Sequence, residues 1–140
     1  TLGVDDGRVA MLVAVLEKKA GLDLAGHDLY VNVAGGVRIV EPAVDLAVMA
    51  AVASSFLDVP VPPRVAVAGE VGLTGEVRGI AGADARVREA ARLGFERIVL
   101  PRGSEVTAEA AGDLAIERVA GVGDLMVRLF GNRARDRSDA

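Results

Sequence analysis

Short runs rich in valine, isoleucine and leucine alternate along this chain with segments that have the periodicity of an α-helix. After Asp5 and Asp6, apolar residues at positions 9, 12, 13 and 16 follow the spacing of one helix face. Residues 29–33 alternate with period two, and residues 98–100 form a continuous apolar run, so both are expected to be strands. Strands that alternate with helices throughout predict the α/β (α+β) class.

The other elements follow from the same patterns, with glycine and proline marking their ends. We expect helices from Asp6 to the stop at Gly21, over residues 43–56 after Glu41-Pro42, over 84–93, from a cap at Ser104 to Ala111, and over 124–130. We expect strands over 29–33, 37–40, 98–100 and 116–119, and a hairpin whose arms, 65–69 and 76–80, flank a turn at 73–75. Because residues 43–56 are apolar almost all round, that helix should have no solvent face and should be buried in a core or in a subunit interface.

Composition restricts the class of protein further. The chain has 140 residues, enough for one domain, and its apolar residues (51%) include few aromatics (3%), so the core must consist of Val, Ala, Leu and Ile. A net charge of −4 argues against a nucleic-acid binder driven by bulk charge. The apolar run 46–57 is shorter than the roughly 20 residues that cross a bilayer. We expect a soluble, cytoplasmic protein with no membrane partner.

The residue types needed for catalysis or metal binding are scarce. There is no cysteine, and His27 is the only histidine, so we expect no metal site in this chain. Ser54 and Ser55 would need a lysine base, and the only lysines, Lys18 and Lys19, fall at the end of the first helix. Gly35-Gly36 lacks the Gly-Lys-Ser/Thr of a nucleotide-triphosphate loop, so we expect no nucleotide cofactor here.

Arginines gather in one stretch, at Arg86, Arg88, Arg92 and Arg97. Asp84 precedes Arg88 by four residues, and Glu89 and Glu96 are interleaved, so these arginines could form an ion-paired, solvated helix face. The spacing favours that interpretation. The alternative is a surface that contacts the phosphates of a nucleic acid, and these four arginines are its candidate residues.

Four segments carry a resemblance to a known family. They are residues 28–47 (DLYVNVAGGVRIVEPAVDLA), 53–63 (ASSFLDVPVPP), 69–78 (GEVGLTGEVR) and 88–101 (REAARLGFERIVLP). In order and spacing they resemble the C-terminal domain of the RadA (Sms) family of bacterial DNA repair proteins, over about residues 9–130. That domain is similar to the proteolytic domain of Lon. The resemblance implies a ribosomal protein S5 domain 2-like fold, with residues 1–130 as one Lon-protease-like domain of a longer chain and 131–140 as a flexible polar tail.

The Lon catalytic dyad does not carry over to this sequence. Its Gly-Pro-Ser-Ala-Gly motif falls on residues 41–45, which places Ala43 at the position of the nucleophilic serine. The general-base lysine falls on Asp84. Alanine has no nucleophile, and a carboxylate cannot act as the amine of the dyad. We therefore expect no peptidase activity and no catalytic residue.

The resemblance also implies the setting of this domain. RadA proteins resemble DNA-dependent ATPases that drive branch migration of recombination intermediates, and in them a zinc module and a RecA-like ATPase precede the Lon-like domain. ATP, Mg and Zn are thus expected upstream, not in this chain. The expected partners are copies of the same chain in a hexameric ring, single-stranded or branched DNA, and RecA. Two alternatives stay open: an active Lon-type serine peptidase and a chaperone-like scaffold that binds protein.

Overall fold

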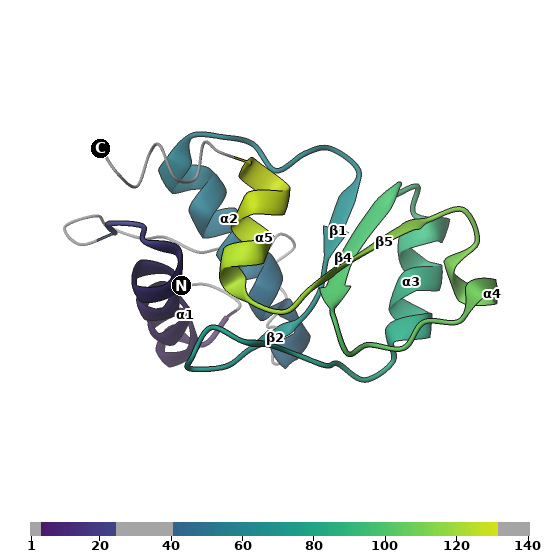
Figure 1. Cartoon of the computed structure of the whole chain (residues 1–140), viewed down its shortest axis with the longest axis horizontal. Coiled ribbons are helices and arrows are strands. Elements are labelled where there is room, and N and C mark those ends of the chain that lie inside the picture. The colour runs from purple at the N-terminus through teal and green to yellow at the C-terminus, as the bar shows by residue number, and fades with distance from the viewer. Residues whose placement is uncertain (1–3, 25–40, 132–140) are drawn as a thin grey trace.

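The computed structural model describes residues 4–24 and 41–131 (Figure 1). The strands expected over 29–33 and 37–40, the residue His27 and most of the expected tail lie outside the described residues. Those expectations remain predictions.

A parallel sheet of three strands lies at the centre of the described fold. Its strands are β1 (Val65–Val67), β4 (Arg97–Pro101) and β5 (Ala115–Val119), in the order β1-β4-β5. Ile98 is aligned with Ala66 on one side and with Ile116 on the other. Because neighbouring side chains along a strand point to opposite faces, residues 98 and 100 face one layer of helices, and residues 97 and 99 face the other.

Helices lie on both faces of the sheet (Figure 1), and each face has its own hydrophobic core. The larger core packs Val99 and Val119 against three helices, α1 (Asp6–Ala20), α2 (Asp45–Leu57) and α5 (Val122–Phe130). The smaller core packs Ile98 and Leu100 against α3 (Ala83–Arg92) and the short α4 (Ala108–Ala111). The α/β class is confirmed.

Helix α1 has the ends that the sequence predicted. The Asp5 carboxylate accepts a hydrogen bond from the Arg8 amide at 3.0 Å, and Gly21 adopts the left-handed conformation that ends the helix. Its apolar stripe is buried, with Leu12 and Leu16 essentially without solvent contact. Helix α3, strand β4 and strand β5 also lie within one or two residues of their predicted ranges, and α5 begins two residues early.

Helix α2 differs from its prediction in its first residue and in the exposure of one row of side chains. A 3₁₀ turn (Pro42–Val44) precedes it, so the α-helix itself starts at Asp45. Met49 and Ala53 are fully buried, but Ala47, Ala51 and Ser55 are exposed. The expectation that this helix is buried all round is therefore wrong for the core of a single chain, and its burial in a subunit interface remains a prediction. Alanine suits either environment, so the apolar sequence did not show that this i, i+4, i+8 row faces outward.

The predicted hairpin has a different first arm. The antiparallel partners are β2 (Glu70–Val71) and β3 (Val77–Arg78), whereas residues 65–67 pair in parallel with β4. The prediction that 65–69 pair with 76–80 is wrong because strand pairing depends on contacts distant in sequence. The turn at 73–75 is where it was expected.

The cap predicted at Ser104 is also wrong. Thr107 caps α4, with its hydroxyl accepting from the Ala110 amide at 3.2 Å, while Ser104 is buried in the preceding loop. No helix among the described residues is long and apolar enough to span a membrane.

Candidate functional site

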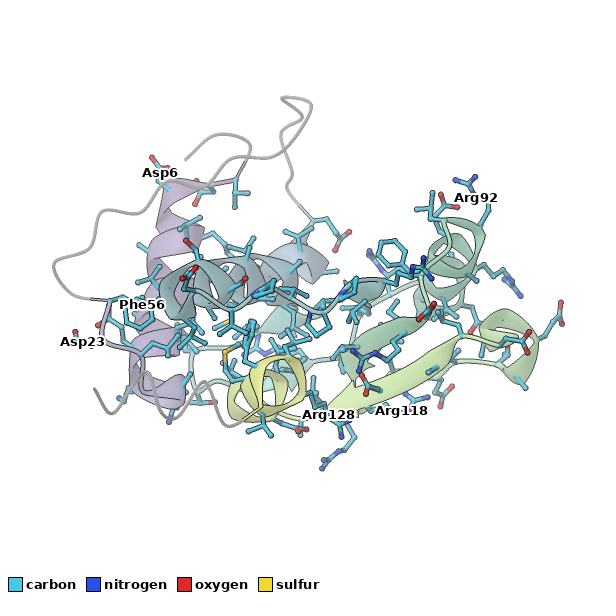
Figure 2. All side chains as sticks on the ribbon, turned by 90° about the horizontal axis from the view of Figure 1, so that it is seen from above. Asp6, Asp23, Phe56, Arg92, Arg118 and Arg128 are labelled. Atoms are coloured by element: carbon cyan, nitrogen blue, oxygen red, sulfur yellow. The ribbon has the colours of Figure 1, made fainter. Side chains whose placement is uncertain are left out.

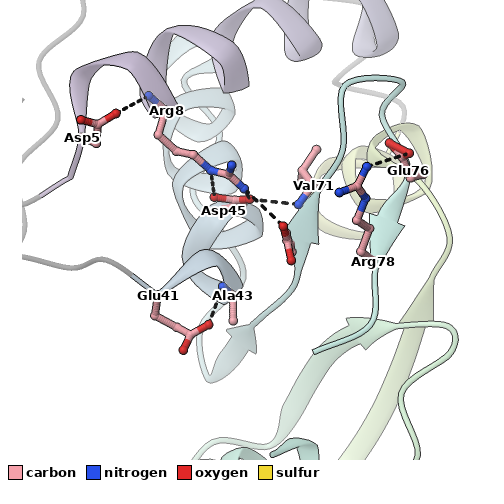
Figure 3. A network of polar contacts seen from close by, with 9 residues as sticks. Asp5, Arg8, Glu41, Ala43, Asp45, Val71, Glu76 and Arg78 are labelled. Carbon is pink, nitrogen blue, oxygen red and sulfur yellow. Dashed lines mark hydrogen bonds and ion pairs between the residues drawn. The ribbon is translucent and has the colours of Figure 1, made fainter. Parts of the chain in front are cut away.

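The position expected to hold a Lon nucleophile is a buried methyl group. Ala43 lies in the 3₁₀ turn before α2 and is 2% exposed. Its amide donates to the Glu41 carboxylate at 3.1 Å (Figure 3), and its carbonyl accepts from the Gly69 amide at 2.8 Å. Both backbone groups of residue 43 therefore serve to fix the turn, and its side chain offers no reactive atom.

The position expected to hold the Lon lysine is a structural carboxylate. Asp84, in the first turn of α3, accepts from the Thr107 amide at 2.9 Å and from the Thr107 hydroxyl at 3.0 Å. These hydrogen bonds, the backbone one first, lower the pKa of Asp84. The carboxylate therefore stays ionised at neutral pH, and it ties α3 to the start of α4.

An ion pair joins the segments that carry these two positions. The Arg86 guanidinium lies 3.6 Å from the Glu41 carboxylate, and its Nε donates to the Ala81 carbonyl at 3.2 Å. Glu41 is two residues before Ala43, and Arg86 is two residues after Asp84. The fold thus brings the two Lon-equivalent segments together, with an arginine–glutamate pair between them.

Asp45, the last residue of the Lon-equivalent motif, is the buried acid of the described fold and was not singled out from the sequence. It is 1% exposed at the first residue of α2. Arg8 of α1 contacts it through both Nε, at 2.9 Å, and Nη2 (Figure 3). The Val71 amide on β2 donates to the same carboxylate at 3.0 Å.

This pair affects the electrostatics of the site. The hydrogen bond from Arg8 to Asp45 raises the pKa of the guanidinium, and Glu70, 3.9 Å away, adds to that effect. A signal was present in the sequence, because Asp45 interrupts an apolar segment. Its partner lies 37 positions away, however, so the local pattern could not identify the pair.

The structure brings together three of the four candidate DNA-binding arginines. Arg86, Arg88 and Arg92 share helix α3, and Figure 2 shows Arg92 at the outer end of that layer. Arg97 lies elsewhere. It is on β4 and points to the opposite face of the sheet, where it contacts Glu117 at 3.3 Å. Alternation along the strand separates Arg97 from Ile98 and hence from α3.

The three α3 arginines differ in their partners. Arg92 bonds to Glu89, which raises the pKa of Arg92 and lowers that of Glu89. Arg86 pairs with Glu41. Arg88 is exposed and makes no ion pair within the described parts of the chain. Glu96, expected to pair within this group, contacts Arg64 instead, at 2.8 Å.

The neighbourhood of α3 also contains acidic side chains. Helix α4 packs beside α3, and Glu105, Glu109 and Asp113 are exposed on and around α4. They weaken the positive potential near Arg88. Among residues 4–24 and 41–131, no three His, Cys, Asp or Glu side chains are grouped so that they could hold a metal ion.

Comparison with known families agrees with this geometry. The Lon protease (S16) C-terminal proteolytic domain matches residues 14–130. The chain belongs to the Lon proteolytic-domain family. Within this family its resemblance to the RadA Lon-like domain is confirmed: it is 54% identical over 99 residues to the DNA repair protein RadA of Bacillus subtilis, 44% over 124 residues to that of Listeria monocytogenes, and 41% over 130 residues to that of Streptococcus pneumoniae.

These alignments cover 71%, 89% and 93% of this chain but only 22%, 27% and 31% of the respective RadA proteins. The chain thus spans less than a third of the length of these curated relatives. The Lon-like domain described above corresponds to one part of such proteins.

Proposed function

We propose that this Lon-like domain is a non-proteolytic platform for oligomerisation and DNA binding in a RadA-type DNA-dependent ATPase. The parent protein would act in recombinational DNA repair, in branch migration of recombination intermediates. The observation that carries the proposal is the pairing of high identity to RadA proteins with the absence of both dyad side chains, at Ala43 and Asp84.

The geometry supports a non-proteolytic role. A Ser–Lys dyad needs a hydroxyl within hydrogen-bond reach of an unprotonated amine. Residue 43 is a buried methyl group, and the Asp84 carboxylate is engaged by Thr107. The hydroxyl of Ser54 donates to the Val59 carbonyl at 2.7 Å, which leaves it committed to the end of α2.

DNA contact is proposed through the outer face of α3, with Arg88 as its centre. Arg88 has no ion-pair partner among the described residues, and Arg92, one helical turn further on, shares its exposure. Arg86 would contribute at the edge. Arg97, on the other face of the sheet, would not contact the same DNA segment. A single α3 surface would bind DNA weakly. Six copies of this surface in a hexameric ring would raise the apparent affinity for DNA.

The other partners and cofactors belong to the parent protein in this proposal. ATP, Mg and Zn would bind domains upstream of this chain. The parent protein would contact RecA at recombination intermediates. The DNA would be single-stranded or branched. The parent protein would be cytoplasmic.

Salt-titrated DNA binding of the full-length protein tests the proposal. Each phosphate that is no longer bound should reduce the slope of log affinity against log salt by about 0.7 on single-stranded DNA. We expect Arg88→Glu/Arg92→Glu to lower both affinity and slope while the assembly persists. Arg128→Glu, on α5 across the sheet, is the control for the reversal of a single arginine charge away from α3. Unchanged binding by the α3 variant would refute α3 as the DNA surface.

A protein-binding scaffold is the second candidate. The exposed acids around α4 and the net charge of −4 favour a protein partner over DNA for this face. If the parent protein shows no salt-dependent DNA binding but retains other proteins through this domain, the second candidate replaces the first. Cleavage of fluorescent casein would instead favour the peptidase alternative.

A further inference from the structure

The most exposed large apolar side chain of the described structure is at the tip of the β2–β3 hairpin. Leu73 is 73% exposed, compared with 59% for Leu93 and for Val127. Its neighbours Val71 and Gly72 are buried, and Thr74 is exposed and polar. Leu73 therefore projects alone and does not belong to a broad apolar patch.

The tip, residues 72–75, is held in one conformation. The Gly72 amide donates to the Glu76 carbonyl at 2.9 Å, and the Gly75 amide donates to the Gly72 carbonyl at 3.0 Å. The Glu76 carboxylate accepts from the amide and from the hydroxyl of Thr74, at 3.2 and 2.9 Å, and these bonds lower its pKa. The Gly75 carbonyl accepts from the Val122 amide at 3.0 Å, which anchors the tip to α5.

Lys19 lies at this tip, near the end of α1, and the other lysine of the chain, Lys18, directly precedes it. A β-carbon added at Gly75 would be 2.7 Å from Cγ of Lys19, so the stem of Lys19 lies directly over the turn. Lys18 is the adjacent residue, and both are exposed. Within residues 4–24 and 41–131 neither makes an ion pair. Glu17 falls in the exposed row of Ala10 and Ala14, on the side of α1 opposite its buried stripe.

We propose that this tip is a second DNA contact, in which Leu73 packs against an unstacked base while Lys18 and Lys19 contact the flanking phosphates. The inference rests on the proposed DNA-binding function and extends it to a surface apart from α3. Proteins that separate or bend strands use single apolar side chains as wedges beside cationic residues. A protein partner would need about 800 Å² of contact, which one projecting leucine does not supply.

The rigidity of the tip supports this use. A loop already fixed by hydrogen bonds loses little conformational entropy when it binds. The hydrogen bonds to Thr74 occupy the Glu76 carboxylate, and Arg78, 3.9 Å away, partly offsets its charge. The negative charge of Glu76 beside the tip is thus partly compensated by Arg78.

The test uses the full-length protein, a fluorescent oligothymidine carrying one 2-aminopurine, and a potassium chloride titration. We expect Leu73→Ala to weaken binding about five- to ten-fold with the salt slope unchanged, and to abolish the change in 2-aminopurine fluorescence on binding. Lys18→Gln/Lys19→Gln should instead reduce the salt slope, by about 0.7 for each phosphate that is no longer bound. Val127→Ala, an exposed apolar residue of α5, is the matched control and should bind as the parent does.

The outcomes separate this inference from the proposed function. If the parent binds DNA, the α3 variant binds poorly and the tip variants bind normally, the tip inference fails and the function stands. If Leu73→Ala changes the mass of the assembly and leaves DNA affinity intact, the tip is a protein contact and the inference is overturned. If the parent protein does not bind DNA, both fail.

Discussion

Arg8, in the first turn of α1, holds the buried carboxylate of Asp45 at the first residue of α2. The same carboxylate accepts the Val71 amide, so one acid joins two helices and the hairpin at the place where a Lon protease would carry its nucleophile motif. The start of α2 is therefore a structural junction in this domain. The buried Asp45 carboxylate stabilises the fold only while Arg8 and the Val71 amide bind it.

Substitution of Arg8 should lower the stability of the fold, because the Asp45 carboxylate loses its cationic partner. Arg8→Met leaves the Asp45 carboxylate buried with one amide donor, and we expect a loss of about 2–4 kcal/mol, less than for a fully buried pair because Arg8 is one-third exposed. Adding Asp45→Asn, which can still accept from Val71, should recover part of the loss. Urea unfolding of both variants measures this, and additive losses would show that the two residues are not coupled.

The two faces of α2 should respond differently to the same charge. Ala53 is fully buried, so Ala53→Asp should destabilise by several kcal/mol, about 3 or more. Ala47 is exposed on the same helix, so Ala47→Asp should change stability by less than about 1 kcal/mol. Thermal melts of this matched pair check the assignment. Equal losses would mean that Ala47 is covered by something in the folded protein.

Helices and the two longer strands could be predicted from sequence because their signals are local. Asp5 and Gly21 bound α1 by capping, and the short apolar run at 98–100, which ends at Pro101, indicated a buried strand. The partner of residues 65–67 could not be predicted, because parallel pairing joins β1 to β4 across about 30 residues of intervening chain.

The residues at the two Lon dyad positions could be predicted from the sequence, but the spatial arrangement of the residues around them could not. Ala43 and Asp84 were identified by motif alignment. Arg97 faces away from α3 because α3 covers the other face of the sheet. Tertiary packing decides which face the helix covers, so the local sequence could not show it. The burial of Asp45 depends on Arg8, which lies 37 positions earlier in the sequence, on another helix.

Asp84 should make folding stability sensitive to acid. Its pKa in the fold lies below the ordinary 3.8, because the Thr107 amide and hydroxyl favour the carboxylate. The contribution of this carboxylate to folding stability is therefore full above pH 3.8 and is lost as the pH falls through the lower pKa of the folded state. Asp84→Asn should remove this part of the pH dependence. Denaturant midpoints measured from about pH 6 down to about pH 3 would contradict the account if the variant and the parent lost stability in parallel.

Restoring the dyad should not restore peptidase activity. In Ala43→Ser/Asp84→Lys the lysine would replace the acceptor for Thr107 with an ammonium group at a helix start, where positive charge is disfavoured. The charge of Arg86 would lower the pKa of that amine by repulsion but would not place it beside residue 43. We expect no turnover of fluorescent casein, with circular dichroism as the check on folding. Measurable turnover would show that the rest of the protease machinery is intact.

If this domain assembles its parent protein, the mass of that protein in solution depends on the domain. Light scattering should be recorded for the full-length protein and for the same protein lacking this domain, with ATP binding as the check that the remainder is folded. We expect a hexamer for the intact protein and a smaller species for the truncated one. A truncated protein that still forms the hexamer would contradict this expectation.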